Sequence, residues 1–305
     1  MRAPFAGTSA FGAEVLRGLV DAGVEVPLVL SQPDRPAGRN RTPTPPPVAA
    51  LARELGLPLI QPERALDALD DLRAVEPSAV AICAYGQLLP QDLLDLCPWL
   101  NLHPSALPRW RGAAPIERML MAGDTASAVA IMQTVLALDA GPVVAVESFP
   151  VGPDDDAGDV EAAALRRGVP LLVAALAAAA AGALHDAPQA EAGTTYADKL
   201  TRDDRLIDPH AHGVGATADR VRALRPRIGA LLALDGDPVT VWRVVAADAP
   251  LAPGAVTAAD GRLVVGVADG ALEIVELQSP GRRAMAAADW LRGRRTAPTA
   301  AGRPT

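Results

Sequence analysis

The chain has 305 residues, half of them hydrophobic, which is enough for roughly two domains with buried cores. Its formal net charge of −8 is unevenly distributed: residues 1–200 carry 14 basic and 24 acidic side chains, whereas residues 201–305 carry 14 basic and 12 acidic ones. The less acidic C-terminal part allows, without requiring, a local site for a polyanion.

Composition also excludes several classes of protein. With only two cysteines, Cys83 and Cys97, the chain has neither a disulfide framework nor the spacing that is typical of a metal site. The N-terminus lacks the basic and apolar regions of a signal peptide. The longest apolar run, Val169–Leu184, is shorter than the ~18–20 residues that span a bilayer. We therefore expect a soluble, cytoplasmic protein that uses no membrane.

The first 190 residues alternate between short apolar segments and segments of helical periodicity. We expect strands around Phe5 and at residues 24–31, 57–62, 78–90, 100–110, 127–141 and 142–151. We expect helices between Ser9 and Gly23 and at residues 48–58, 65–77, 92–100, 114–124 and 159–184, the last with Gly168–Pro170 as its breaking point. This alternation predicts an α/β domain with a parallel sheet.

The sequence changes character after Ala187. A polar stretch is followed by a helical pattern that ends near Pro226 and then by apolar strands. Asp260–Gly261 and Asp269–Gly270 separate alternating apolar segments, which is typical of two-residue hairpin turns. These strands predict a small antiparallel barrel or sandwich. We therefore expect an N-terminal domain at residues 1–190, a linker at 191–207 and a C-terminal domain at 208–305.

Asn101 and His103 are the strongest candidates for chemistry. They are two residues apart at the end of an expected strand, so both side chains point to one face. Ligands bind beyond the carboxyl ends of parallel strands, and an amide beside an imidazole suits acyl transfer. Asp139, expected at the end of another strand, could orient the histidine. A structural histidine is equally compatible with the local spacing, and for Asp139 the local sequence alone favours an ordinary Asp-x-Gly turn.

Other reactive side chains lack the surroundings that their chemistry requires. The turn Gly7–Gly12 has neither P-loop nor GxGxxG spacing, so we expect a tight strand–helix turn there. Ser105 is not in a GxSxG turn, which disfavours a nucleophilic serine. Cys83 lies in an apolar run and is expected in the core. His210 and His212 have no third ligand at a suitable spacing, so a metal site is disfavoured.

Arginines gather on the proline-rich segment 32–47, around Trp110, along the helix near Pro226 and near the C-terminus. The proline-rich segment is expected to be a loop, and it carries Arg39 and Arg41. Arginines on loops and on a small β-barrel suit a phosphate backbone. A solvated surface explains any one cluster, but their number in an acidic chain favours a nucleic-acid partner.

Several segments together resemble the methionyl-tRNA formyltransferase family. These segments are "FAGT", "QPDRPAGR", "AYGQLLP", "NLHPSALPRWRGAAPI", "LDAG" and, after the long helix, "YADKL". Asn-x-His-x-Ser with a distant Asp is shared by transferases that use 10-formyltetrahydrofolate. "RGAAPI", "QPDRPAGR" and a C-terminal β domain point to the tRNA enzymes. The resemblance covers nearly the whole chain.

The resemblance implies a Rossmann-like, mostly parallel N-terminal domain and an OB-like C-terminal barrel that helps to hold tRNA. The implied reaction moves a formyl group from 10-formyltetrahydrofolate to the α-amine of methionine on initiator methionyl-tRNA. By motif position, Asn101 and His103 stabilise the oxyanion and Asp139 orients the histidine. No metal is expected, because the donor is already an activated acyl carrier, and we expect a monomer.

The implied folate-binding residues are Tyr85, Gly86, Leu88, Ser105, Ala106, Leu107 and Pro108. Arg39 and Arg41 match the loop that contacts the tRNA acceptor stem. Three positions depart from the family pattern: Ala106 replaces a leucine, Ala137 a glycine, and Pro142 a polar residue. Of these, Ala106 is expected to loosen one wall of the folate pocket.

Two alternatives stay open. The first is a formyltransferase acting on a small amine, such as a nucleotide-sugar or glycinamide ribonucleotide, which would not need the C-terminal domain. The second is an RNA-binding protein built on an inactive enzyme. The presence of Asn101, His103 and Asp139 disfavours the second alternative.

Overall fold

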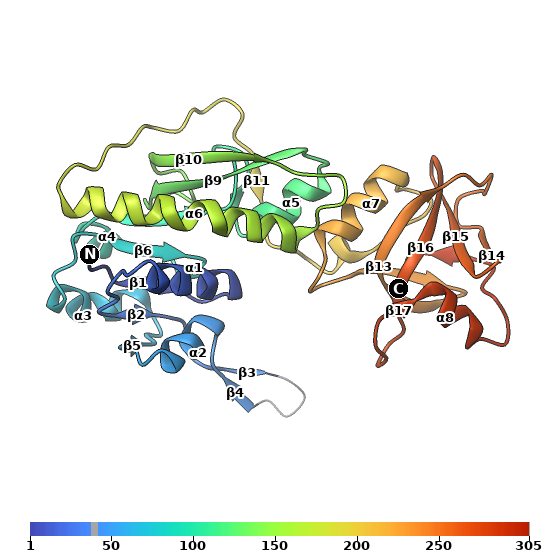
Figure 1. Cartoon of the computed structure of the whole chain (residues 1–305), viewed down its shortest axis with the longest axis horizontal. Helices are drawn as coiled ribbons and strands as arrows, with labels where there is room; N and C mark the ends of the chain where they lie inside the picture. Colours follow the sequence, from blue (N-terminus) through green and yellow to red (C-terminus); the bar gives the residue numbers. More distant parts are fainter. Residues whose placement is uncertain (38–41, 305) are drawn as a thin grey trace. The chain divides into compact units, whose positions relative to one another are not determined.

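The computed structural model describes residues 1–37 and 42–304. Contacts within the chain divide it into two compact units (Figure 1). The N-terminal unit comprises Met1–Pro115, Ala126–Pro150 and Glu161–Ala197. The C-terminal unit comprises Ile116–Thr125, Val151–Val160 and Asp198–Thr305. Two short internal segments therefore belong with the C-terminal part of the chain.

A seven-stranded sheet forms the centre of the N-terminal unit, in the order β10–β9–β7–β6–β1–β2–β5. Its strands are β1 (Phe5–Gly7), β2 (Val29–Leu30), β5 (Leu59–Ile60), β6 (Val80–Cys83), β7 (Trp99–His103), β9 (Ala126–Gln133) and β10 (Val143–Pro150). Strands β1, β2, β5, β6 and β7 run parallel to one another, whereas β9 and β10 are antiparallel to their neighbours. This confirms the predicted mostly parallel α/β sheet. The strand order reverses between β1 and β6, and ligands bind at the carboxyl edge of such a reversal.

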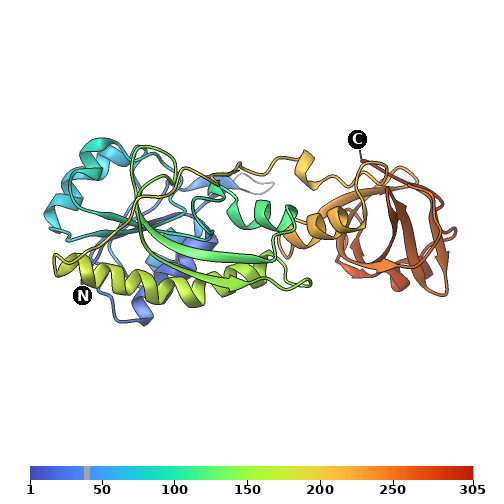
Figure 2. The same ribbon diagram turned by 90° about the horizontal axis from the view of Figure 1, so that it is seen from above.

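Helices cover both faces of this sheet (Figure 2). The helices of this unit are α1 (Ala10–Asp21), α2 (Pro47–Glu54), the 3₁₀ helix η1 (Ala65–Ala68), α3 (Leu69–Ala74), α4 (Gln91–Leu94) and all but the first turn of α6 (Ala157–Ala180). α5 (Pro115–Met121) belongs, apart from Pro115, to the C-terminal unit. α1 and α6 lie side by side, because Gly18 of α1 faces Val169 of α6. On the opposite face Leu72 of α3 and Leu93 of α4 pack into one core cluster with Trp99.

The long helix α6 continues unbroken through Pro170, contrary to the expected break at Gly168–Pro170. Pro170 is exposed, so the carbonyl that loses its helical hydrogen bond can be solvated. Gly168 faces the sheet: an added Cβ would lie 2.7 Å from a methyl group of Val129 and 2.9 Å from one of Leu102. Among the described residues, α6 is the one helix whose length and composition would suffice to cross a membrane.

The proline-rich segment was expected to be a loop, but two short strands pair on either side of residues 38–41. β3 (Arg35–Ala37) and β4 (Thr42–Thr44) are antiparallel, with Pro36 opposite Pro43. Neither proline has an N–H, so the ladder hydrogen bonds come from the flanking residue pairs. Prolines at non-hydrogen-bonded positions therefore do not prevent a β-ribbon here.

The C-terminal unit is a near-closed antiparallel barrel, in the order β14–β15–β16–β13–β12–β18 with β17 on β16, which confirms the predicted class. Its elements are β12 (Ala230–Leu234), β13 (Asp237–Ala247), β14 (Val256–Ala259), β15 (Arg262–Val267), β16 (Gly270–Gln278), β17 (Met285–Ala286), β18 (Ala301–Gly302), η2 (Asp203–Arg205), α7 (Val214–Ala223) and α8 (Ala287–Arg292). A bridge between Ala255 and Ala300 links the two ends of the sheet.

Aspartate–glycine turns set the register of the barrel. Asp260–Gly261 joins β14 to β15 with both φ angles positive, as a type I′ turn requires. Asp235–Gly236 joins β12 to β13 in the same way, although the sequence analysis did not single it out. The expected turn at Asp269–Gly270 is wrong by one residue, because Gly270 is already paired with Val267.

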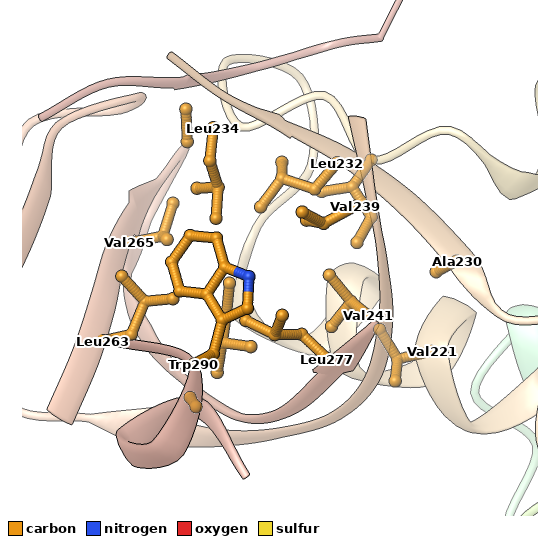
Figure 3. Packing of buried hydrophobic residues seen from close by; sticks show 14 of the residues in the cluster. Val221, Ala230, Leu232, Leu234, Val239, Val241, Leu263, Val265, Leu277 and Trp290 are labelled. Carbon is orange, nitrogen blue, oxygen red and sulfur yellow. The ribbon is translucent and has the colours of Figure 1, made fainter. Parts of the chain in front are cut away.

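Large apolar side chains fill the barrel (Figure 3). Trp290 of α8 points into a cluster that includes Leu234, Leu263 and Leu277. α8 thus closes one side of the barrel with a single aromatic ring. The ring N–H is not left unpaired, because it donates to Ser279 Oγ at 2.9 Å.

Candidate active site

Asn101 and His103 lie on one face at the carboxyl end of β7, as the spacing predicted. β7 is held between β6 and β9, with Asn101 opposite Ile82 and Met132 and His103 opposite Ala130. His103 is buried and Asn101 is half-buried. Within residues 1–37 and 42–304 the Asn101 amide has no hydrogen-bond partner, so it can donate to a bound molecule.

A backbone carbonyl, rather than Asp139, holds the imidazole of His103. The Trp110 carbonyl oxygen lies 3.0 Å from His103 Nε2. Since a carbonyl only accepts, Nε2 carries the hydrogen in this contact. Trp110 has a φ of 63°, in the left-handed region that non-glycine residues rarely adopt. The other ring nitrogen, Nδ1, is the one that faces Asp139.

Asp139 reaches the histidine from a loop and not from the end of a strand. β9 ends at Gln133, six residues earlier, which corrects the predicted strand boundary. The carboxylate oxygen Oδ2 of Asp139 lies 3.8 Å from His103 Nδ1, beyond hydrogen-bond distance. The same oxygen accepts a hydrogen bond of 2.9 Å from the Gly112 N–H. Asp139 is therefore positioned by the backbone next to Trp110, close enough to stabilise an imidazolium electrostatically.

The segment Ser105–Pro108 turns the chain away from β7. The Ser105 hydroxyl is buried and donates to the Arg109 carbonyl oxygen at 2.8 Å, so this side chain is committed to the turn. This contact agrees with the expectation that Ser105 is not a nucleophile. Ala106, Leu107 and Pro108 are each half-buried.

The segment after β6 contains the remaining predicted folate residues, Tyr85, Gly86 and Leu88, which differ in exposure to solvent. Tyr85 packs in the core at 2% exposure, and burial raises its pKa to about 12. Leu88 is 86% exposed. Gly86 has a φ of 78°, and an added Cβ would lie 2.6 Å from Gln32 Nε2. Of the three, Leu88 can contact a ligand through its side chain, whereas Tyr85 can do so only through its backbone.

Thr8, after β1, and Gln32, after β2, are two polar residues outside the predicted site that bond the turn after β6. The Thr8 hydroxyl donates to the Tyr85 carbonyl oxygen at 2.7 Å, and Gln32 Nε2 donates to the same oxygen at 3.0 Å. The glycine-containing turn at residues 7–12 therefore supports the neighbouring loop through Thr8. A polar residue one or two positions after a strand, such as Thr8 or Gln32, gives no distinctive signal in a single sequence.

The candidate arginines fall into two groups. Arg39 and Arg41 lie outside the described residues. Several C-terminal arginines pair with acids: Arg222 bonds Asp219 at 2.8 Å, and Arg262 bonds Glu273 at 2.7 Å. Within the described residues, no group of three or more His, Cys, Asp or Glu side chains could hold a metal ion.

The remaining candidates are structural. His212 Nδ1 accepts from the Asp208 N–H, and burial, aided by Arg220, lowers the His212 pKa. Cys83 is fully buried, which raises its pKa, and burial raises the pKa of Cys97 to about 11. Both thiols are therefore protonated at neutral pH. The fold places the amide of Asn101 beside the imidazole of His103 on β7 and the carboxylate of Asp139 3.8 Å from that imidazole, and these three groups form the candidate site.

Comparison with known sequences covers both units. The chain matches the family profile described as formyl transferase over residues 2–176 and the formyl transferase C-terminal domain over residues 199–295. It is 43% identical over 303 residues to a methionyl-tRNA formyltransferase of Halorhodospira halophila, covering 97% of both chains. A methionyl-tRNA formyltransferase of Neisseria gonorrhoeae is 41% identical over 304 residues, covering 96% of this chain and 97% of the relative.

Solved structures share the fold at low identity. HypX from Aquifex aeolicus in complex with tetrahydrofolic acid superposes with a TM-score of 0.68 at 17% identity, over 98% of this chain and 50% of HypX. The sugar 3N-formyl transferase WlaRD superposes with a TM-score of 0.65 at 12% identity, over 93% of this chain and 99% of that one.

Proposed function

The chain belongs to the formyl transferase family, and we propose that it transfers a formyl group from 10-formyltetrahydrofolate to the α-amine of methionine on initiator methionyl-tRNA. The observation that carries this proposal is the placement of Asn101 and His103 at the end of β7 with the Asp139 carboxylate 3.8 Å from the His103 ring. Support for the substrate comes from relatives of about 40% identity that are named for methionyl-tRNA and that match nearly the whole length of the chain.

The proposed reaction begins when the free amine attacks the formyl carbon. The carbonyl oxygen becomes an oxyanion in the tetrahedral intermediate, and the unpartnered amide of Asn101 donates a hydrogen bond to it. One such donor, fixed in place before the reaction, lowers the activation free energy by roughly 3–4 kcal/mol. Because Asn101 has no other partner among the described residues, it has no competing bond to break.

His103 moves the proton in this scheme. Its Nδ1 accepts a proton from the attacking nitrogen as the new carbon–nitrogen bond forms. The resulting imidazolium donates through Nε2 to the Trp110 carbonyl and lies 3.8 Å from the Asp139 carboxylate, and through Nδ1 it assists Asn101 at the oxyanion. The proton then passes to N10 of tetrahydrofolate as the bond between N10 and the formyl carbon breaks. Asp139 stabilises the charged ring in this scheme, and Trp110 sets its orientation.

Exposed apolar side chains on the loops after β6 and β9 suit the flat ring system of a folate. Leu136 and Leu138 precede Asp139 on its loop and are 64% and 59% exposed, and Leu88 is more exposed still. Large aliphatic side chains gathered on exposed loops are typical of a ligand surface. We propose that these residues, with Gly86 and Ala106–Pro108, bind the folate, and that Tyr85 and Ser105 support their loops. The reaction as written uses no metal.

The tRNA partner is proposed to use two parts of the chain. Residues 208–305 would form the tRNA-binding domain, in the part of the sequence that has a slight excess of basic over acidic side chains. Arg39 and Arg41 would contact the acceptor stem from the segment between β3 and β4. Residues 1–190 would form the catalytic domain, and 191–207 the linker. We propose a cytoplasmic monomer.

An assay with purified protein and 10-formyltetrahydrofolate tests this function. Formyl transfer to charged initiator methionyl-tRNA is measured beside transfer to elongator methionyl-tRNA and to small amines, namely an amino nucleotide-sugar and glycinamide ribonucleotide. We expect kcat/KM to be highest for initiator methionyl-tRNA. A higher kcat/KM for a small amine would reject the tRNA substrate while leaving the formyl transfer chemistry intact.

A further inference from the structure

The segment Asp186–Ala197, which leads out of the N-terminal unit after α6, runs beside the loops of the candidate site. Much of it is exposed, and its composition is polar with small residues. Three of its residues that are not exposed are important here: Gln189 and Thr195 are half-buried, and Ala197 is fully buried. Each of these three contacts a backbone segment that carries or supports a site residue.

Gln189 holds the loop of Asp139 from outside. Its Nε2 donates to the carbonyl oxygens of Asp139 and Gly141, at 2.8 and 2.7 Å. Its Oε1 accepts from Nε and Nη2 of Arg111, at 3.0 and 2.8 Å. One amide therefore joins the Asp139 loop to the chain that follows Trp110.

Thr195 and Ala197 bond the segment that follows Trp110. Thr195 Oγ1 accepts from the Trp110 N–H at 2.9 Å, and the Thr195 carbonyl accepts from the Arg111 N–H at 3.0 Å. Two residues further on, the Ala197 carbonyl accepts from Ala113 as β11 (Tyr196–Ala197) pairs with β8 (Arg111–Gly112). Trp110 supplies the carbonyl that fixes His103, and Gly112 supplies the N–H that binds Asp139.

We propose that Asp186–Ala197 is a clamp that fixes the distance and orientation between His103 and Asp139, with Gln189 and Thr195 as its positioning residues. This inference rests on the proposed catalytic roles of His103 and Asp139. The two residues share no direct hydrogen bond, so their geometry depends on the segments that hold them. The clamp bonds both segments, and a misplacement of about 1 Å can cost about 100-fold in rate.

Gln189→Glu is the sharpest variant because it changes one atom and tests one side of the clamp. A glutamate still accepts from Arg111, but it cannot donate to the Asp139 and Gly141 carbonyls and instead repels them. We expect kcat to fall roughly 10- to 100-fold, with the KM for tRNA changed less than about threefold. Gln91→Glu is the matched control: Gln91 is exposed on α4 and bonds Asp95, so kcat should not change.

A second measurement tests whether the clamp restrains the two loops, without relying on enzyme activity. Hydrogen–deuterium exchange should become faster in residues 134–142 of Gln189→Glu and stay unchanged in α1. Thr195→Val, which removes the acceptor for the Trp110 N–H, should have the corresponding effect on residues 108–113. Unchanged exchange at both places would overturn the clamp even if a variant had low activity or reduced stability.

A double-mutant cycle separates this inference from the proposed function. If Gln189 acts through Asp139, adding Gln189→Glu to Asp139→Asn should change kcat by less than about twofold. If the two losses multiply instead, Gln189 does not act through Asp139, and the clamp is rejected while the catalytic assignment stands. If Asp139→Asn alone retains full kcat, both the assignment and the clamp are rejected.

Discussion

Asn101 differs from its neighbours in the candidate site because its polar side chain has no partner within the described residues. His103 bonds the Trp110 carbonyl, and Asp139 accepts from Gly112. A half-buried amide with unused donors loses part of its hydration in the folded state. A substrate oxygen that develops negative charge would use those donors, so removing them should affect the transition state more than binding.

Asn101→Ala should therefore lower kcat by about 100- to 1,000-fold, which is typical for loss of one oxyanion donor. The KM values for tRNA and folate should change by less than about threefold, since the ground-state formyl oxygen carries little charge. Steady-state formylation assays measure both quantities. A large rise in KM with unchanged kcat would assign Asn101 to binding instead.

Tyr85 offers a prediction about pH. Its hydroxyl is buried without a hydrogen-bond partner in the described structure, and burial raises its pKa from 10.0 to about 12. The unfolded chain ionises first, so the stability associated with neutral Tyr85 is complete below pH 10 and is lost as the pH rises to about 12. Tyr85→Phe should remove this loss at alkaline pH.

The measurement for Tyr85 is chemical denaturation at pH 7 and at pH 11, with ultraviolet titration of phenolate. At pH 7, Tyr85→Phe should change the free energy of unfolding by no more than about 1 kcal/mol, because it removes an unsatisfied group. The chain has only two tyrosines, and Tyr196 is exposed, so the late-titrating phenol can be assigned. An unchanged titration in the variant would show that Tyr85 is not the shielded group.

Sequence spacing could predict residues of the site whose positions follow from β periodicity. Asn101 and His103 share a face because they are two residues apart on a strand. The role of Trp110 could not be predicted, because it depends on where a carbonyl points when φ is 63°. Gln189 and Thr195 act from about 50 residues away or more in sequence, and no local pattern marks them.

At the level of elements, the loop between β9 and β10 packs tightly against the end of β9. Gly141 packs so tightly that an added Cβ would overlap the Gln133 carbonyl oxygen. This contact involves backbone, which cannot move aside as the end of a flexible side chain can. The backbone of the loop that carries Asp139 is therefore sterically restricted where it passes the end of β9.

Gly141→Ala should displace this loop, lowering kcat roughly 10- to 100-fold and the free energy of unfolding by about 1–3 kcal/mol. Gly215→Ala is the matched control. Gly215 lies in α7 with open space around it, so alanine should stabilise the helix slightly. Thermal unfolding and formylation assays measure both effects. Equal behaviour of the two variants would contradict the tight packing at Gly141.

Periodicity and turn chemistry predicted most elements, and the exceptions have local causes. The β-ribbon β3–β4 was missed because prolines argue against strands unless they occupy non-bonded positions, as Pro36 and Pro43 do. The break expected in α6 was wrong because Pro170 lies on the exposed side. Boundaries such as the end of β9 depend on tertiary contacts that one sequence does not display.

At the scale of the whole molecule, the two units are interleaved in sequence. The C-terminal unit includes Ile116–Thr125, where Arg118 bonds Asp204 at 2.5 Å and Met121 packs against the barrel core. Deleting residues 208–305 would remove most of the barrel core against which Met121 packs. A truncation would therefore test stability as much as substrate choice, and changes in ionic strength probe tRNA binding more cleanly.

If tRNA is held through its phosphates, its KM should rise about 10- to 100-fold between roughly 50 and 200 mM salt, because counterions are released on binding. The KM for 10-formyltetrahydrofolate, which is smaller and less charged, should change much less over the same range. Initial-rate measurements at several salt concentrations give both values. A tRNA KM that does not depend on salt would argue against phosphate recognition.

The most direct test of the central claim is single-turnover formylation of initiator methionyl-tRNA by wild type and His103→Ala at saturating protein. His103 is proposed to move the proton, so the variant should react at least about 100-fold more slowly. Its dissociation constant for tRNA should stay within about threefold of wild type. A His103→Ala variant that transfers the formyl group at the wild-type rate would contradict the assignment of this site.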